Sequence, residues 1–389
     1  MGSNIGIYNL HMQAMGGGEK LTLVLAEHLS LSHHVSLFCA EPIDITSLEK
    51  FFDVDLSRVT VRALNGLGPF SRVIAKVPGV RGPASTLQHY LQLKDLNLDL
   101  FINNSYASGL KCPAPRGIFM CMFPHTRPRL LSPGIQQHSG GSSSKNTIDS
   151  YPSIVAISEY SADWTRQMWE REAEVIYPPC DAMGPPNQKR KVILHVGRFI
   201  ADRDEDGRHH KGQRLLLEIF NQMTDLHKEG WKLHLVGSAG TDKYSADFAN
   251  TLRRTAENFP VHFHINAPRD ELRDLFRSAS IYWHGTGYGF DAGRYPSKQE
   301  HFGISTVEAM TAGAVPVVYG SGGQKEIVTN EIDGLYWENI DGLLMQTRRL
   351  ANDPTLSARL ANAAVLSSKR FSREAFTARI DQLIAKLLS

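Results

Sequence analysis

The most informative stretch of the sequence runs from Glu300 to Val328 and reads EHFGISTVEAMTAGAVPVVYGSGGQKEIV. Its STVEAMTAG segment predicts a helix, because Ser305 or Thr306 can cap the first turn and Gly313 can end it. VPVVY follows as a short buried strand, and GSGGQKEIV predicts a second tight loop that opens a second helix. Two loop-to-helix junctions therefore lie close together in the sequence. The N-terminus of a helix presents N–H groups that suit a phosphate.

Two carboxylates flank the first of these junctions. Glu300 precedes the predicted helix, and Glu308 lies within it. A carboxylate is a poor partner for phosphate, but it accepts hydrogen bonds from hydroxyl groups. An anion site beside two carboxylates therefore favours a ligand with both phosphates and sugars, which is a nucleotide sugar. The alternative interpretation is an ordinary helix–strand unit with surface glutamates.

This stretch resembles the retaining glycosyltransferases of family 4, also called group 1, whose hallmark is Glu-x7-Glu. Glu300 and Glu308 have that spacing, and the string E-H-F-G-I-x-x-V-E-A-M-x-A-G-x-V-P-V-V makes the resemblance more specific. The resemblance implies an α/β protein of the GT-B fold, with two Rossmann-like domains facing across a cleft. It also implies a retaining front-face displacement that needs neither a metal ion nor another cofactor.

The same resemblance implies roles for residues of the stretch. Glu308 would hold the ribose hydroxyls of the donor, and Glu300 would contact the hydroxyls of the donor sugar. Backbone N–H groups of Phe302, Gly303 and Ile304 would assist Glu300. EHFGIS followed by SGG is similar to mannosyltransferases that act on lipid-linked oligosaccharides. We therefore expect GDP-mannose as the donor, a UDP-sugar as the next candidate, and a glycan or lipid-linked acceptor.

Two cations follow a predicted strand of the second half. Arg198 ends HVGRF, and Lys211 stands in a Lys-Gly pair after a polar loop. Breaking a sugar–phosphate bond builds negative charge on the diphosphate, which fixed cations offset. Both residues match positions that bind the donor diphosphate in the family that the chain resembles. Surface salt bridges are the alternative interpretation.

Two further candidates lie in the first half. MGGGEK contains Gly16, Gly17 and Gly18, which let the backbone approach a phosphate at the start of a predicted helix. The resemblance implies that this loop lies over the donor diphosphate, near the acceptor; a simple tight turn is the alternative. His125, in MFPHTRP, follows an apolar strand. The resemblance implies that His125 contacts the donor sugar and helps catalysis, whereas the alternative is a loop histidine that caps a turn.

Alternating strands and helices indicate parallel, doubly wound sheets in both halves of the chain. We predict an acceptor-side domain over residues 1–177 and a donor-binding domain over residues 192–370. The Pro-rich, polar segment 178–191 reads as a linker between them. By resemblance, residues 371–389 form a helix that crosses back to the first domain. SGGSSSK, from Ser139 to Lys145, is either a natural loop or an engineered linker.

Composition restricts the class of protein. The chain has 389 residues, of which 42% are hydrophobic, as in an ordinary globular protein. It lacks a run of about 18 apolar residues, so no transmembrane helix is predicted. None of its four cysteines shows C-x2-C spacing, so we expect no zinc site, only reduced thiols of a cytoplasmic protein.

The charge is uneven although the net charge is only +2. Between Leu56 and Ile148 the sequence has eleven Lys and Arg residues and two acids, a local balance of +9. Such a segment is attracted to an anionic surface, which suggests peripheral contact with the inner face of a membrane or with a lipid pyrophosphate. Arg127 and Arg129 are candidates for an anionic acceptor. A solvated basic face is the alternative, and the lack of a binding motif argues against nucleic acid.

Other functions remain open at this point. A GT-B phosphorylase would cleave glycosides with phosphate, and a nucleotide-sugar epimerase would use the same ligand differently. A non-catalytic subunit that only binds a sugar nucleotide is a third reading. The intact set of Glu300, Glu308, Arg198 and Lys211 argues against the last of these.

Overall fold

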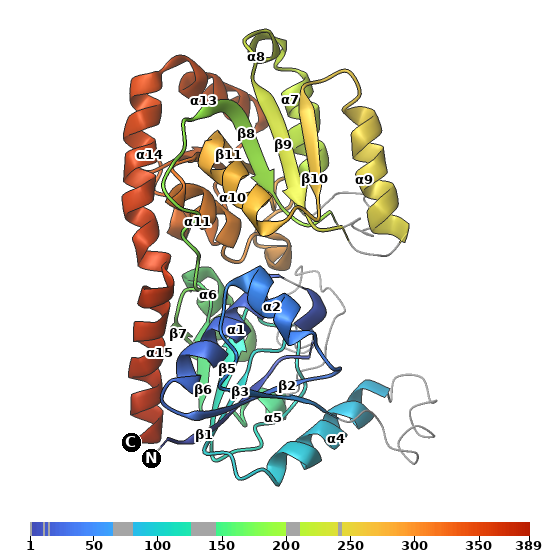
Figure 1. Ribbon diagram of the computed structural model, residues 1–389, viewed down its shortest axis with the longest axis vertical. Helices are drawn as coiled ribbons and strands as arrows, with labels where there is room; N and C mark the ends of the chain where they lie inside the picture. Colours follow the sequence, from blue (N-terminus) through green and yellow to red (C-terminus); the bar gives the residue numbers. More distant parts are fainter. Residues whose placement is uncertain are drawn as a thin grey trace. The chain divides into compact units, whose positions relative to one another are not determined.

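The computed structural model describes residues 2–10, 12–14, 16–64, 81–125, 145–199, 211–239 and 243–389. It divides the chain into two compact units (Figure 1). One unit combines Met1–Pro179 with Arg373–Ser389, and the other is Cys180–Ser372. Each unit contains a parallel sheet with helices, which confirms the predicted pair of α/β, Rossmann-like domains.

The first unit contains a seven-stranded sheet with the order β3-β2-β1-β4-β5-β6-β7, and every pair of neighbours is parallel. Its strands are β1 (Asn4–Tyr8), β2 (His34–Cys39), β3 (Val59–Ala63), β4 (Leu100–Asn103), β5 (Arg116–Cys121), β6 (Ser153–Ala156) and β7 (Glu174–Val175). Its helices are η1 (Met12–Ala14), α1 (Gly17–Ser30), α2 (Ile45–Phe52), α4 (Arg81–Lys94), α5 (Lys145–Ile148), α6 (Glu159–Trp169) and α15 (Arg373–Leu388). The central strands are almost wholly apolar and buried, as expected for a parallel sheet covered on both faces.

The last helix of the chain is part of this first unit. His28 of α1 lies 2.7 Å from Asp381 of α15, and Arg379 donates to Glu174 at 2.9 Å. The guanidinium of Arg373 also donates to the carbonyl of Phe52 at 2.7 Å. These contacts tie the C-terminal helix to elements from the first half of the sequence.

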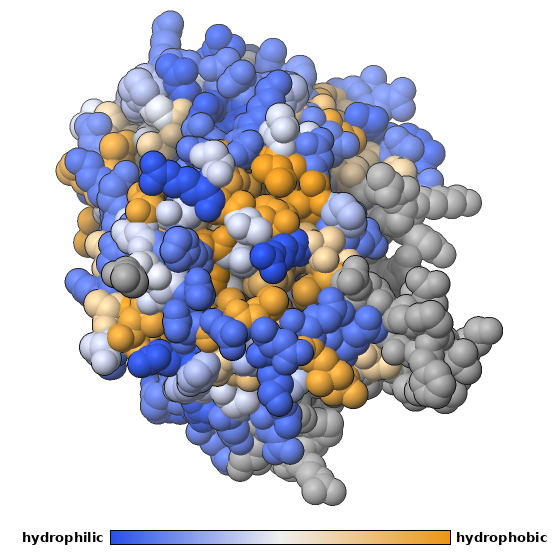
Figure 2. All heavy atoms as spheres, turned by 60° about the horizontal axis from the view of Figure 1, so that its bottom comes forward, coloured by the Kyte–Doolittle hydropathy of each residue, from blue (hydrophilic) through white to orange (hydrophobic). Residues whose placement is uncertain are grey.

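The helix α4 exposes apolar side chains. Leu87 and Leu91 lie one helical turn apart and are 60% and 55% exposed, whereas His89 and Leu93 of the same helix are buried. Figure 2 turns the lower end of Figure 1, where α4 lies, toward the viewer. Hydrophobic residues are visible on that face among hydrophilic ones (Figure 2).

The second unit contains a six-stranded parallel sheet with the order β10-β9-β8-β11-β12-β13. Its strands are β8 (Arg190–Val196), β9 (Lys232–Gly237), β10 (Val261–Ile265), β11 (Ala279–His284), β12 (Val315–Tyr319) and β13 (Leu335–Trp337). Its helices are α7 (Gln213–Asn221), α8 (Thr224–Lys228), α9 (Lys243–Thr255), α10 (Arg269–Ser278), η2 (Pro296–Lys298), α11 (Ile304–Thr311), α12 (Gln324–Ile327), α13 (Ile340–Asn352), α14 (Pro354–Ser368) and η3 (Lys369–Phe371).

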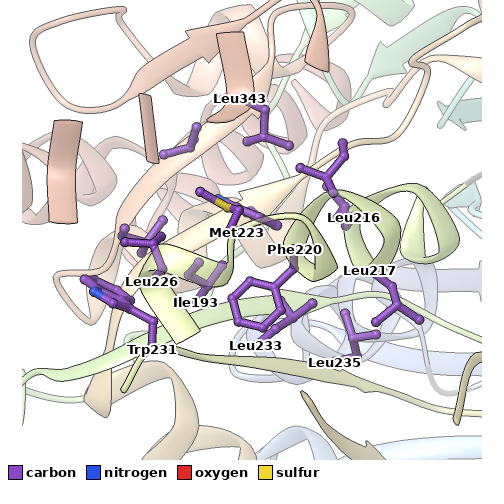
Figure 3. Packing of buried hydrophobic residues seen from close by; sticks show 14 of the residues in the cluster. Ile193, Leu216, Leu217, Phe220, Met223, Leu226, Trp231, Leu233, Leu235 and Leu343 are labelled. Atoms are coloured by element: carbon purple, nitrogen blue, oxygen red, sulfur yellow. The ribbon is translucent and has the colours of Figure 1, made fainter. Parts of the chain in front are cut away.

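The core of the second unit fixes the positions of its strands. Leu216, Leu217 and Phe220 of α7 belong to one buried cluster with Leu233 and Leu235 of β9 (Figure 3). Burying one such side chain stabilises the fold by about 1.5–3 kcal/mol. The sheet that carries the strand ends is therefore a rigid support for the residues attached to them.

The predicted linker 178–191 contains the boundary between the two units and also residues that pack within the second unit. Cys180 and Met183 are buried, and Asp181 pairs with Arg269 of α10. The ammonium of Lys189 donates to two backbone carbonyls of the second unit, and β8 already begins at residue 190. Pro185, Pro186, Asn187 and Gln188 are exposed, so the segment combines a polar surface stretch with contacts that belong to the second unit.

Candidate functional site

The order of the strands marks one place in the second unit for a ligand. The order reverses between β8 and β11, which are direct neighbours in the sheet. In such sheets a ligand binds beyond the carboxyl ends of the strands at this reversal. Gly197 and Arg198 follow β8 there, and His284 is the last residue of β11.

The Glu300 carboxylate is held by two donors at this point. Lys211 Nζ lies 2.9 Å and His284 Nε2 lies 3.0 Å from the same oxygen, Oε2. The three side chains are 29% (Lys211), 2% (His284) and 16% (Glu300) exposed. Burial by itself would raise the pKa of Glu300, but the Lys211 ammonium and the His284 hydrogen bond outweigh it and hold that pKa well below its usual range. Glu300 is therefore an ion at neutral pH with part of its surface still accessible.

Glycines and Gln213 position Lys211. Gly212 adopts a left-handed conformation with φ of 74°, and a Cβ there would lie 3.1 Å from the Gly285 carbonyl oxygen. Gln213 begins α7, and its amide donates to the carbonyls of Gly197 and Arg198 at 3.1 and 2.9 Å. The start of α7 is thereby fixed to the loop after β8. The Arg198 side chain is exposed, and residues 200–210, between the two predicted diphosphate ligands, lie outside the described residues.

The two predicted loop-to-helix junctions pack directly on each other. The N–H of Gly323 donates to the carbonyl of Glu300 at 2.8 Å. A Cβ on Gly322 would lie 2.3 Å from the Glu300 carbonyl oxygen, and one on Gly323 would lie 2.5 Å from that of His301. Only glycine permits this close approach, so the packing against the loop of Glu300 and His301 explains the two glycines of the SGG sequence.

The helix α11 begins differently from the prediction. Its N-cap is Gly303, with φ of 118°, and the helix runs from Ile304. The predicted cap by Ser305 or Thr306 is wrong, because both hydroxyls have other hydrogen bonds. Ser305 accepts from Tyr282 at 2.7 Å, and Thr306 donates to Gln324 at 3.0 Å. The Phe302 side chain is buried and supports the loop from within.

The second glutamate of the motif lies near the first. Glu308 is half-buried on α11. Burial raises the pKa of Tyr282, and the nearby carboxylates of Glu300 and Glu308 add to that rise. Both carboxylates therefore act on the same buried phenol. The structure thus brings Lys211, Glu300 and Glu308 together in one unit, with Gly303 at the head of the helix between the two glutamates.

The glycine loop of the first unit lies at the corresponding reversal of that sheet, between β1 and β4. Gly16 is the N-cap of α1, and its N–H donates to the Glu19 side chain at 2.7 Å, while Gly17 opens the helix and is exposed. The carbonyl of Gly18 accepts from Asn104 at 3.0 Å. The Glu19 carboxylate therefore already occupies part of the helix N-terminus that the sequence predicts for phosphate.

His125 has an unusual environment in the first unit. It is 8% exposed, and neither ring nitrogen has a hydrogen-bond partner among the described residues. The ring meets Tyr106 and Trp169 edge to face, with centroids 5.0 and 5.8 Å away. Burial lowers the pKa of His125 to about 4, so the ring is neutral at pH 7. Arg127, Arg129 and residues 139–144 lie outside the described residues.

Sequence reasoning missed His284, although it is one of the two groups that hold Glu300. It follows the apolar strand residues IYW, and a polar residue at the carboxyl end of a parallel strand is a signal for a site. The same rule singled out His125. What the sequence did not show is which carboxylate the imidazole would reach.

Residues 182–366 match the family model described as glycosyl transferases group 1. This match confirms the predicted family resemblance, and it covers nearly all of the second unit, including Lys211, Glu300 and Glu308. The second unit is therefore similar to the group 1 glycosyl transferases over nearly its whole length.

Several similar proteins are known by name. The chain is 27% identical over 257 residues to the human GDP-Man:Man(3)GlcNAc(2)-PP-Dol alpha-1,2-mannosyltransferase. The aligned region covers 60% of this chain and 48% of the human protein. Its mouse counterpart is 29% identical over 258 residues, or 61% of this chain and 49% of that protein. The chain thus spans about half the length of these curated relatives.

Solved structures show the same fold. Anabaena HepE, solved with UDP and glucose, has a TM-score of 0.70 at 16% identity and covers 99% of this chain and 100% of its own. The sucrose-phosphate synthase of Thermosynechococcus elongatus has a TM-score of 0.72 at 16% identity, with 99% of each chain covered. The predicted GT-B fold is confirmed by these similarities.

Proposed function

We propose that the protein is a glycosyltransferase that moves mannose from GDP-mannose to a lipid-linked glycan. The observation that carries the proposal is the ionised Glu300, held by Lys211 and His284 at the strand reversal of a group 1 domain. The names of the human and mouse relatives support a GDP-mannose donor and a lipid-linked acceptor. The HepE structure with UDP and glucose keeps a UDP-sugar as the next candidate.

The candidate residues would contact different parts of the donor: its sugar, its ribose and its diphosphate. Glu300 would accept hydrogen bonds from hydroxyls of the donor sugar, with N–H groups of the loop from Phe302 to Ile304 beside it. Glu308, four residues beyond the start of α11, would accept hydrogen bonds from the ribose. Arg198 and Lys211 would offset the charge of the diphosphate. The roles predicted for Gly16, Gly17, Gly18 and His125 stay predictions.

We propose a retaining front-face displacement as the reaction. The bond from the anomeric carbon to the diphosphate oxygen breaks, and a bond to the acceptor oxygen forms on the same face. The proton of the acceptor hydroxyl passes to the leaving diphosphate. Because the leaving group gains negative charge, fixed cations at Lys211 and Arg198 lower the barrier.

Metal independence is part of the proposal. Across the described ranges, no three or more His, Cys, Asp or Glu side chains are gathered as metal ligands would be. The test is transfer in the presence of a chelator, with unchanged activity expected.

Peripheral contact with an anionic membrane would bring the protein to a lipid-linked acceptor. Among the described helices, none has the length and apolar character needed to span a membrane. Exposed Leu87 and Leu91 on α4 and the excess of basic residues between Leu56 and Ile148 support such contact at a cytoplasmic face.

The direct test is transfer of radiolabelled mannose from GDP-mannose to a lipid-linked oligosaccharide by the full chain. We expect a labelled lipid product, and little label from UDP-sugars. Release of sugar phosphate by inorganic phosphate would instead indicate a phosphorylase, and conversion of the donor sugar without an acceptor would indicate an epimerase. Nucleotide-sugar binding without any turnover would indicate a non-catalytic subunit.

A further inference from the structure

Two described residues donate to one and the same oxygen of the Glu300 carboxylate. Lys211 and His284 both donate to Oε2, at 2.9 and 3.0 Å, and no described residue donates to Oε1. The side chain keeps 16% of its surface exposed. One oxygen is thus anchored, while the other is left as an acceptor.

We infer that His284 is a positioning residue that fixes the orientation of this carboxylate, so that Oε1 faces a hydroxyl of the donor sugar. The inference deepens the proposed function and rests on it. Lys211 offsets the negative charge of the Glu300 carboxylate, whereas His284 fixes the orientation of that carboxylate.

The two donors to Glu300 have different roles because the structure holds them with different rigidity. His284 belongs to β11, which pairs with β8 on one side and β12 on the other, and its carbonyl accepts from the Trp337 indole at 3.1 Å. The imidazole is 2% exposed and has two side-chain torsions. Lys211 has a long flexible chain and is 29% exposed. The rigid, buried donor determines the angle of the carboxylate more strictly than the flexible one.

The hydrogen bonds define the tautomer of His284. A carboxylate only accepts, so Nε2 must carry the hydrogen. Nδ1 is buried and has no partner in the described part of the chain. The hydrogen bond to Glu300 is therefore donated by Nε2, the ring nitrogen that faces the carboxylate.

A second buried imidazole lies on the adjacent strand. His195 of β8 lies with Nδ1 2.9 Å from the Trp283 carbonyl oxygen. Burial lowers the pKa of His195 to about 3, so this ring is neutral at pH 7. The ammonium of Lys211 lies on the same carboxylate oxygen of Glu300 as the His284 imidazole.

The test compares His284→Leu with His284→Gln. Leucine has a similar size but no donor, whereas the glutamine amide nitrogen can take the place of Nε2. We expect kcat/KM for mannose transfer to fall about tenfold or more in His284→Leu, as for loss of a hydrogen bond to a charged group. GDP affinity should stay within about threefold, because the contact serves the sugar end, and His284→Gln should recover most of the activity.

The double variant His284→Leu/Glu300→Gln shows whether His284 acts through Glu300. If it does, the double variant is no slower than Glu300→Gln alone, because the shared interaction is already lost. His227→Leu is the matched control: it also removes one imidazole hydrogen bond in this unit, to the Phe220 carbonyl at 2.8 Å, from α8 rather than from the site. Melting temperatures of all variants separate lost folding from lost positioning.

Three outcomes would overturn the inference. These are wild-type activity in His284→Leu, equal losses of GDP and sugar affinity, and losses that multiply in the double variant. A wild-type protein that binds no nucleotide sugar and transfers no sugar would overturn the proposed function, and the inference with it. If the wild-type protein transfers mannose and the His284→Leu variant is equally active, the inference is overturned while the proposed function stands.

Discussion

At the scale of single residues, the site depends on how one carboxylate is kept charged while half-buried. Burial beside the end of β11 removes much of the hydration of Glu300, but Lys211 and His284 stabilise its charged form instead. The local motifs made Glu300, Glu308 and Lys211 candidates, and the structure places all three in the second unit. The contribution of His284 depends on a fold that brings residues 284 and 300 together, which no local pattern encodes.

The substitution Glu300→Gln tests the charge at this position. It keeps the size of the side chain but leaves Lys211 without its counter-charge and weakens acceptance of sugar hydroxyls. We predict a fall in kcat/KM of about 100-fold or more. Glu308→Gln is the control, and it should weaken GDP binding more than it affects the sugar end. Near-normal transfer by Glu300→Gln would contradict the assigned role.

His125 predicts a pH dependence of stability. Its folded pKa is lowered to about 4, below the ordinary value of about 6.5, so the unfolded chain binds more protons between these values. The free energy of unfolding should therefore fall as pH drops from 6.5 to 4, by on the order of 3 kcal/mol from this group. Urea unfolding of the wild type and His125→Phe across this range measures it. Parallel curves for the two proteins would show that His125 is not the source.

At the scale of elements, the start of α11 shows where local reasoning succeeds and fails. The sequence predicted the helix and its end at Gly313, whose φ of 71° fits a left-handed stop. It assigned the cap to a hydroxyl residue, because propensity favours Ser and Thr at that place. The structure uses Gly303 instead, since the neighbouring Gln324 amide would lie 2.0 Å from a Cβ there. Tertiary contacts of this kind are absent from the sequence pattern.

Gly303→Ala tests this junction. The substitution adds strain at φ of 118° and forces Gln324 away, so we predict a loss of stability of about 2–4 kcal/mol and lower transfer activity. Gly230→Ala is a matched control, because its φ is 88° and nothing lies within 4 Å of the added Cβ. The control should cost about 1 kcal/mol, from strain alone. Equal losses in urea unfolding would contradict the packing argument.

At the scale of the whole molecule, the chain forms two sheets with the same order around a central reversal, and its last helix returns to the first unit. Alternating strands and helices made the two sheets predictable, while the resemblance supplied the returning helix. The boundary between Pro179 and Cys180 lies within the predicted linker 178–191, but composition does not reveal that Cys180 and Met183 are buried. Long-range burial of this kind follows from the fold and not from the local sequence.

Truncation after Ser372 tests the place of the last helix. It removes α15, whose Phe376, Ile380, Leu383 and Ile384 side chains are buried against the first unit. Loss of four such side chains should destabilise the first unit by several kcal/mol, at about 1.5–3 kcal/mol each. Calorimetry should show an early transition for the first unit and a nearly unchanged one for the second. A single unchanged transition would contradict this division.

The central claim is that the second unit binds the nucleotide part of a nucleotide sugar. The most direct measurement is the melting temperature of the full chain with GDP, UDP and ADP, each at the same concentration. A ligand that binds only the folded state raises the midpoint by mass action. We predict the largest rise with GDP, and a smaller rise with GDP in Glu308→Gln. No rise with any of the three nucleotides would contradict the claim.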